Sequence, residues 1–212
     1  MPLNEYRKKR RFDVTTEPSG DAPSDPRAEA KSLLYVIQKH RASQLHYDFR
    51  LEWNAVLLSW AVPKGPSLDP SIKRLAQPVE DHPLEYAGFE GVIPGGEYGG
   101  GTVMVWDTGS WVPEVPDVDE ALRKGDLKFT LRGKKLKGSW VLVRTRGFGR
   151  GGGESWLLIK HRDKFASKRD ITQEQPRSAL SNRTLAEIAR EQGGDVGSAA
   201  ARVTRRVVEM KP

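Results

Sequence analysis

Alternation of hydrophobic and polar residues dominates the middle of the chain. Residues 46–53 (HYDFRLEW) alternate strictly, which is typical of a strand that buries one face. Residues 33–40 (LLYVIQKH) are rich in β-branched and aromatic side chains, and a third apolar run begins after Asn54-Ala55. We expect a hairpin at this dipeptide, and its turn type stays open because alanine is unfavourable at positive φ. Further strands are predicted at residues 78–82, 102–106, 127–131, 139–145 and 156–160.

Glycine and proline separate the predicted strands. Turn-forming residues of this kind fall at positions 63–66, 94–96, 99–101 and 149–153. Many short strands with such turns, and few long helices, predict a mainly β protein with short helices, built as a single β-barrel domain. We place this domain at residues 33–170.

The two ends of the chain differ from its middle. Residues 13–31 are rich in Pro, Ser, Asp and Ala, so residues 1–32 are expected to form a flexible N-terminal arm. Near the other end, Thr184 and Glu187 form a capping-box pattern, and residues 198–210 place valines on one helical face. These signals predict a helical C-terminal tail at residues 171–212, in addition to one short helix at residues 116–123.

Composition excludes several classes of protein. The chain has no cysteine, which rules out a disulfide framework, a thiolate nucleophile and thiolate zinc sites. No apolar run approaches the roughly 20 residues that span a bilayer, and the charged N-terminus lacks the apolar core of a secretory signal. We therefore expect a cytoplasmic protein with no membrane partner.

An excess of positive charge points to a polyanionic partner. Lys and Arg number 35 against 28 Asp and Glu, a net charge of +7. Residues 120–150 hold ten Lys or Arg residues, and residues 7–11 read RKKRR. Such clusters typically contact nucleic-acid phosphates in a salt-sensitive manner. Within the larger cluster we expect Lys134 and Lys135 to make such contacts.

Residues that suit a divalent metal share one face of a predicted strand. His46, Asp48 and Arg50 alternate along it, about 6.6–7 Å apart at successive positions. An antiparallel hairpin would bring His40, at the end of the preceding strand, to the same surface. Two imidazoles and a carboxylate bind Mn²⁺, Fe²⁺ or Zn²⁺ with coordination sites left open, and the guanidinium suits a phosphate. The alternative is an ordinary solvated strand face.

A second polar segment supplies groups for acid–base chemistry. Residues 78–83 (PVEDHP) set Glu80 and His82 on one strand face, where Glu80 is expected to orient His82 or raise its pKa. Arg74 lies upstream, and Lys64 lies in the turn at residues 63–66. With a metal, these groups make up what hydrolysis of a phosphate ester needs: a Lewis acid, cations for the phosphoryl oxygens and a proton donor.

These motifs resemble those of the 3′-phosphoesterase domain of bacterial ligase D and its stand-alone relatives. The resemblance runs from residue 36 to about residue 164, and residues 8–20 (KKRRFDVTTEPSG) resemble that family's N-terminal arm. The combination of HYDFRLE, WAVPKGPS and EDHPLEY is highly specific. The resemblance implies a β-barrel with its site in a groove. It also implies a manganese-dependent enzyme of DNA end joining that removes a 3′-terminal ribonucleoside and then the 3′-phosphate.

The resemblance also implies roles for individual residues. The metal ligands would be His40, His46 and Asp48, with manganese preferred and other divalent transition metals accepted. Arg50 and His82 would contact the scissile phosphate, and His82 would be the acid. Supporting groups would be Arg74, Lys64, Glu80, Tyr86, Arg10 and Glu17.

Two departures from the family pattern stand out. The arm commonly reads Arg-Asp-Phe, and the acid is missing from Arg10-Arg11-Phe12, which puts the diesterase step in question. The chain ends at residue 212 with no ligase or polymerase domain after it, so we expect a stand-alone or excised phosphoesterase. Its expected partners are nucleic-acid 3′ ends and a DNA ligase or end-binding repair protein.

Two other classes of function fit part of the pattern. A non-haem iron oxygenase could use His46, Asp48 and His82 as its two-histidine, one-carboxylate triad. A non-catalytic nucleic-acid-binding barrel could use the basic cluster and the six tryptophans. Neither alternative has a use for the whole set of histidines, aspartate and arginine described above.

Overall fold

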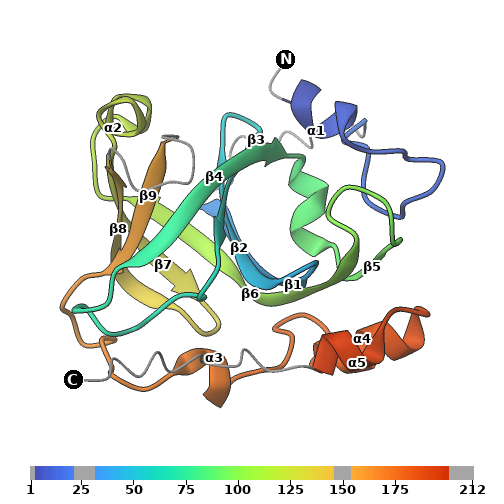
Figure 1. Ribbon diagram of the computed structural model, residues 1–212. Helices are drawn as coiled ribbons and strands as arrows, with labels where there is room; N and C mark the ends of the chain where they lie inside the picture. The colour runs from blue at the N-terminus through green and yellow to red at the C-terminus, as the bar shows by residue number, and fades with distance from the viewer. Residues whose placement is uncertain (1–2, 22–31, 146–153, 201–212) are drawn as a thin grey trace, which may run out of the picture.

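An antiparallel β-barrel forms the body of the protein (Figure 1). The computed structural model describes residues 3–21, 32–145 and 154–200. In this part of the chain one sheet runs β1-β2-β3-β4-β9-β8-β7-β6-β5, and pairing of β1 with β6 closes eight of its nine strands into the barrel. The strands are β1 Leu33–Arg41, β2 Leu45–Trp53, β3 Val56–Val62, β4 Arg74–His82, β5 Gly91–Ile93, β6 Gly101–Pro113, β7 Asp126–Gly133, β8 Lys137–Thr145 and β9 Ser155–Lys160. The predicted mainly β barrel is confirmed.

Short helices flank the barrel. They are α1 Asn4–Lys8, the 3-10 helix η2 Leu84–Gly88, α2 Val118–Lys124, α3 Ile171–Glu174, α4 Leu185–Glu191 and α5 Val196–Ala200. The predicted capping box at the start of α4 is present, with both Thr184 and Glu187 bonded as expected. No helix among the described residues is long and apolar enough to span a bilayer.

Strands β1 and β2 bury residues on both of their faces. The main core takes alternate residues of β2, which are Tyr47, Phe49 and Leu51. Each of the other seven barrel strands also contributes side chains to it. The opposite face of the sheet meets a second, smaller apolar cluster that includes Tyr6 of α1 and Tyr86 of η2. The candidate site therefore lies on the outer face of the barrel wall, beneath the arm and η2.

Two local features of the strands depart from simple alternation. Asn54 and Ala55 have φ angles of 49° and 62°, so the hairpin between β2 and β3 uses the turn with two positive φ angles. Between Ile37 and Gln38 of β1 the pairing with β6 shifts by one residue, and Trp106 becomes a β-bulge. Strand β5 was not predicted, because a three-residue strand leaves no alternation to detect.

The two ends of the chain pack on the barrel in their described parts. Residues 3–21 lie against the outer face through α1 and the loop after it, with Tyr6 fully buried. The tail reaches β5 and β6, where α4 buries Leu185, Ile188 and Ala189. Most of the predicted helix at residues 198–210, part of the leader at 13–31 and the turn at 149–153 lie outside the described residues.

Candidate metal and phosphate site

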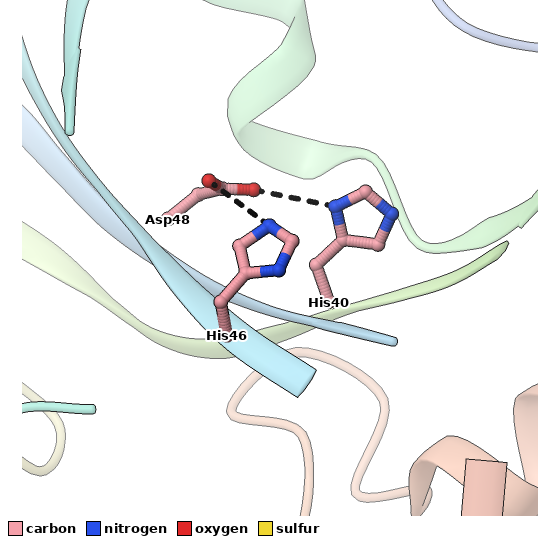
Figure 2. Close-up of side chains that lie close together, drawn as sticks. All are labelled: His40, His46 and Asp48. Atoms are coloured by element: carbon pink, nitrogen blue, oxygen red, sulfur yellow. Dashed lines mark ion pairs between the residues drawn. The ribbon is translucent and has the colours of Figure 1, made fainter. Parts of the chain in front are cut away.

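His40, His46 and Asp48 meet at one end of the β1–β2 hairpin (Figure 2). The antiparallel register pairs His40 with His46, and Asp48 follows two residues later on the same face. Their ligand atoms all lie within 4.8 Å of one another. The predicted hairpin thus brings the three candidate ligands together.

Hydrogen bonds to the backbone select the tautomer of each imidazole. His40 Nε2 donates to the Gly99 carbonyl at 2.8 Å, and His46 Nδ1 donates to the Gln44 carbonyl at 3.1 Å. The remaining nitrogens, His40 Nδ1 and His46 Nε2, lie 3.5 and 3.6 Å from the carboxylate oxygens of Asp48. Three lone-pair acceptors that converge in this way repel one another unless a cation lies among them. The donor set fits a divalent transition metal.

The charges around this group keep its members in their metal-binding forms. Burial alone would raise the pKa of Asp48, but the Arg50 guanidinium 3.3 Å away holds that pKa below its usual value. Burial lowers the pKa of His46. At neutral pH Asp48 is therefore a carboxylate and His46 a neutral imidazole.

Arg50 connects His40, His46 and Asp48, which we call the candidate metal-ligand group, to the rest of the site. Its side chain is buried, with Nε donating to the Gln38 amide oxygen and Nη1 donating to Ser59 Oγ, both at 2.8 Å. Gln38 is fixed in turn by donating to the carbonyls of Tyr86 and Phe89. Sequence reasoning missed Gln38 and Ser59 as supports. The available signal for Gln38 was a polar residue on the same strand face as His40.

His82 lies between two guanidinium groups. Its Nδ1 is 2.8 Å from the Glu80 backbone carbonyl and 2.9 Å from Arg50 Nη1, and its Nε2 is 3.1 Å from Arg10 Nη2. A neutral ring with its proton on Nδ1 donates to the carbonyl and accepts from Arg10. Burial, Arg50 and Arg10 hold the pKa of His82 well below its usual value. Glu80 orients His82 through its backbone carbonyl, which opposes this lowering of the pKa, whereas its carboxylate pairs with Lys9 and Arg10.

The arm completes the site with Arg10. This side chain is 5% exposed and pairs with Glu17 at 2.9 Å and with Glu80 at 3.2 Å. Glu17 also accepts a hydrogen bond of 3.0 Å from the hydroxyl of Tyr86, whose ring lies edge-on to that of His82. Arg10 and Glu17 of the arm thus form one connected network with Glu80 and His82 of β4 and Tyr86 of η2.

These groups line a pocket of about 160 Å³. Arg10, Arg50 and His82 lie on its walls with the candidate metal-ligand group. The loop between β5 and β6 adds Tyr98 and Gly99, which sequence reasoning did not single out. The only signal for them was the glycine-rich turn itself.

Four residues that we expected to contact phosphates lie outside the pocket. Lys64 is exposed and Arg74 begins β4, and neither lines the pocket. Lys134 donates to the Ala179 carbonyl at 2.6 Å, and Lys135 donates to the carbonyls of Gln175 and Arg177. These two ammonium groups hold the tail on the barrel. Arg146 and Arg150 of the basic cluster lie outside the described residues.

Asp81, beside the site, provides a pH-dependent prediction. Burial and the charge of Glu80 raise its pKa to about 6. A folded state that binds this proton more tightly than the unfolded chain loses stability as the pH rises from about 4 through 6. Asp81→Asn should therefore raise the melting temperature at pH 7 and flatten its fall between pH 4 and 6. Thermal unfolding of this variant and of the exposed control Asp13→Asn checks both effects, and equal curves for the two would contradict them.

Comparison with known proteins identifies relatives for most of the chain. A family model described as the DNA ligase D 3′-phosphoesterase domain matches residues 38–144. The multifunctional non-homologous end joining protein LigD of Pseudomonas aeruginosa is 52% identical over 209 residues, which cover 97% of this chain. The LigD non-homologous end joining DNA repair protein of Mycobacterium tuberculosis is 43% identical over 145 residues, 68% of this chain. The chain spans only 24% and 18% of the length of these two relatives.

Proposed function

Because this chain belongs to the family of the DNA ligase D 3′-phosphoesterase domain, we propose that it is a metal-dependent phosphoesterase that processes 3′ ends of DNA. It removes a 3′-terminal ribonucleoside as a phosphodiesterase and a 3′-phosphate as a phosphomonoesterase. The product is a 3′-hydroxyl that a polymerase or ligase can use. Its partners are DNA ends and a ligase or end-binding repair protein, and its place is the cytoplasm.

One observation carries the proposal. Three lone-pair acceptors, on His40, His46 and Asp48, converge beside two buried guanidinium groups, those of Arg10 and Arg50. A divalent cation satisfies the acceptors, and a phosphate group satisfies the guanidinium groups. An oxygenase triad of His46, Asp48 and His82 is less well supported, because both nitrogens of His82 face arginines.

Within this proposal each group has a distinct task. His40, His46 and Asp48 hold the ion, manganese in preference, which when bound polarises a phosphoryl oxygen and neutralises charge. Arg50 and Arg10 bind the remaining phosphoryl oxygens and stabilise the negative charge of the transition state. Glu17 and Glu80 position Arg10, and Tyr86 supports the wall behind His82.

His82 donates the proton to the leaving oxygen. The substrate-free ring is neutral because it is buried and because two guanidinium groups face it. A bound phosphate draws those groups to its own oxygens and adds negative charge, and both changes favour the imidazolium. Substrate binding therefore charges the acid that the reaction needs.

Two DNA duplexes test the proposed function, one ending in a single 3′-ribonucleotide and one ending in a 3′-phosphate. We expect conversion of both to 3′-hydroxyl ends with Mn²⁺ and none in excess EDTA, with products resolved by denaturing gels and mass spectrometry. Mg²⁺ should serve less well, because it prefers an all-oxygen shell. Full turnover in EDTA would exclude the metal site as the catalytic centre.

Replacing His82 with alanine should slow hydrolysis most for substrates that have a poor leaving group. We expect a loss of about 10²–10⁴-fold in kcat for a nucleoside leaving group, because a positioned acid contributes that much. A nitrophenyl phosphate ester needs little protonation and should lose much less. Mn²⁺ affinity should not change, so a His82→Ala variant that no longer binds Mn²⁺ would reassign His82 as a ligand.

Two adjacent arm residues form a matched pair of variants. The side chain of Arg10 is 5% exposed and contacts His82, whereas that of Arg11 is 67% exposed and pairs with Glu97. Arg10→Ala should lower kcat/KM about 10²-fold, the cost of removing one donor to a transition-state oxyanion. Arg11→Ala should stay within a few-fold of the parent protein. Equal losses in the two variants would indicate that only the net charge of the arm matters.

A further inference from the structure

Tyr98 is an exposed aromatic residue at the rim of the pocket. It is 48% exposed, whereas Tyr86, which also lines the pocket, is 2% exposed. Among the described residues on the pocket wall, Tyr98 is thus the tyrosine with a ring open to solvent. Single exposed aromatics are common on proteins, so its significance depends on what holds it in place.

The loop that carries Tyr98 is held on both sides. The next residue, Gly99, has a φ of 75° and accepts the hydrogen bond from His40 Nε2 at 2.8 Å. The preceding residue, Glu97, pairs with Arg11 of the arm. Tyr98 is therefore fixed between a candidate metal ligand and the arm, on the exposed side of the pocket wall.

Two cations, which also pair with Glu80, lie near the ring. Lys9 Nζ lies 4.8 Å from the ring centroid, and the Arg10 guanidinium lies 5.7 Å from it. Lys9 Nζ also lies 3.4 Å from the Tyr98 hydroxyl. Cations that attract phosphates beside an aromatic face that stacks on bases are the combination used to hold single-stranded nucleic acid.

We propose that Tyr98 stacks on the base of the nucleotide that bears the scissile 3′-phosphate. This inference rests on the proposed function and adds a specificity residue to it. The phosphate lies against Arg10, Arg50 and the candidate metal-ligand group, and the base packs against the ring at the rim. The enzyme then selects ends that present a base over ends that have lost one.

Two DNA strands separate stacking from a structural role. They are identical except that the nucleotide bearing the 3′-phosphate carries guanine in one and is a stable tetrahydrofuran abasic residue in the other. Tyr98→Ala should lower kcat/KM about 10- to 100-fold on the first strand, mainly through KM, and leave the second nearly unchanged. Tyr98→Phe should retain the parent activity on both strands. Phe165→Ala serves as the matched control, because Phe165 is 37% exposed beside Lys164 and lies outside the pocket.

The outcomes are distinct. Equal losses on the two strands would overturn stacking and leave Tyr98 as a support for the loop, and no loss on either would also overturn it. If Tyr98→Ala does not fold, Tyr98→Leu compared with Tyr98→Phe makes the same test. If the parent protein processes neither strand, the proposed function itself is contradicted, and not only the stacking.

Discussion

Asp48→Asn is expected to abolish Mn²⁺ binding and turnover while the barrel stays folded. The carboxylate supplies the negative charge among three acceptors, and its loss should exceed the roughly 10–100-fold that a change outside the ligand shell costs. The amide of asparagine can donate to an imidazole lone pair, which relieves the repulsion that the carboxylate causes without an ion. Isothermal titration measures Mn²⁺ binding, end-processing assays measure turnover, and circular dichroism shows whether the barrel stays folded.

His46→Ala and His161→Ala provide a matched pair of histidine variants for this test. His46 contributes Nε2 to the candidate ligand set, whereas His161 lies outside the pocket and bonds to Ser139 Oγ. We expect His46→Ala to lose Mn²⁺ binding and His161→Ala to keep it. If both Asp48→Asn and His46→Ala unfold, the main role of these side chains is to stabilise the fold, and the metal assignment is wrong.

Arg50→Lys is expected to lower kcat/KM about 10²–10³-fold, the second large effect. A lysine ammonium cannot replace the fork of donors that bonds Gln38, Ser59 and Asp48 and still reach a phosphate. Mn²⁺ affinity should not fall, because lysine keeps the positive charge of Arg50 and Arg50 supplies none of the candidate ligand atoms. Kinetics on a 3′-phosphate end and Mn²⁺ titration together separate the two effects.

Arg123→Lys on the exposed surface of α2 is the control for this variant, and its kinetics should match the parent protein. Weaker Mn²⁺ binding in Arg50→Lys would mean that Arg50 acts by positioning Asp48. That result would contradict the proposal that Arg50 contacts the phosphate.

The candidate metal-ligand group was predictable because it depends on local rules. Strand alternation puts His46 and Asp48 on one face, and a short hairpin brings His40 opposite His46. The position of Arg10 was not predictable in the same way. It reaches His82 across 72 positions of sequence, and only packing of the arm on the outer face of the barrel makes that contact.

At Lys134 and Lys135 the structure adds a role that their charge alone did not suggest. Their charge suggested phosphate contacts, but charge does not specify which acceptors a lysine meets in the folded state. The tail supplies backbone carbonyls that need donors, and these two residues provide them. A cluster of basic residues in a sequence can thus stabilise packing of one part of the chain on another.

The bulge at Trp106 makes length a constraint on β6. Interior side chains on this strand have even numbers before the bulge, at Met104 and Trp106, and an odd number after it, at Trp111. A substitution here can be absorbed by repacking, and deleting Trp106 itself would remove the bulge and restore simple alternation. Deleting another residue of β6 while the bulge stays would turn one part of the strand inside out. The loop that ends at Gly101 has no such parity to keep. In an alignment of related chains, a gap at Trp106 would therefore signal a β6 without the bulge and with the same faces, whereas a gap in the loop would change only the rim of the pocket.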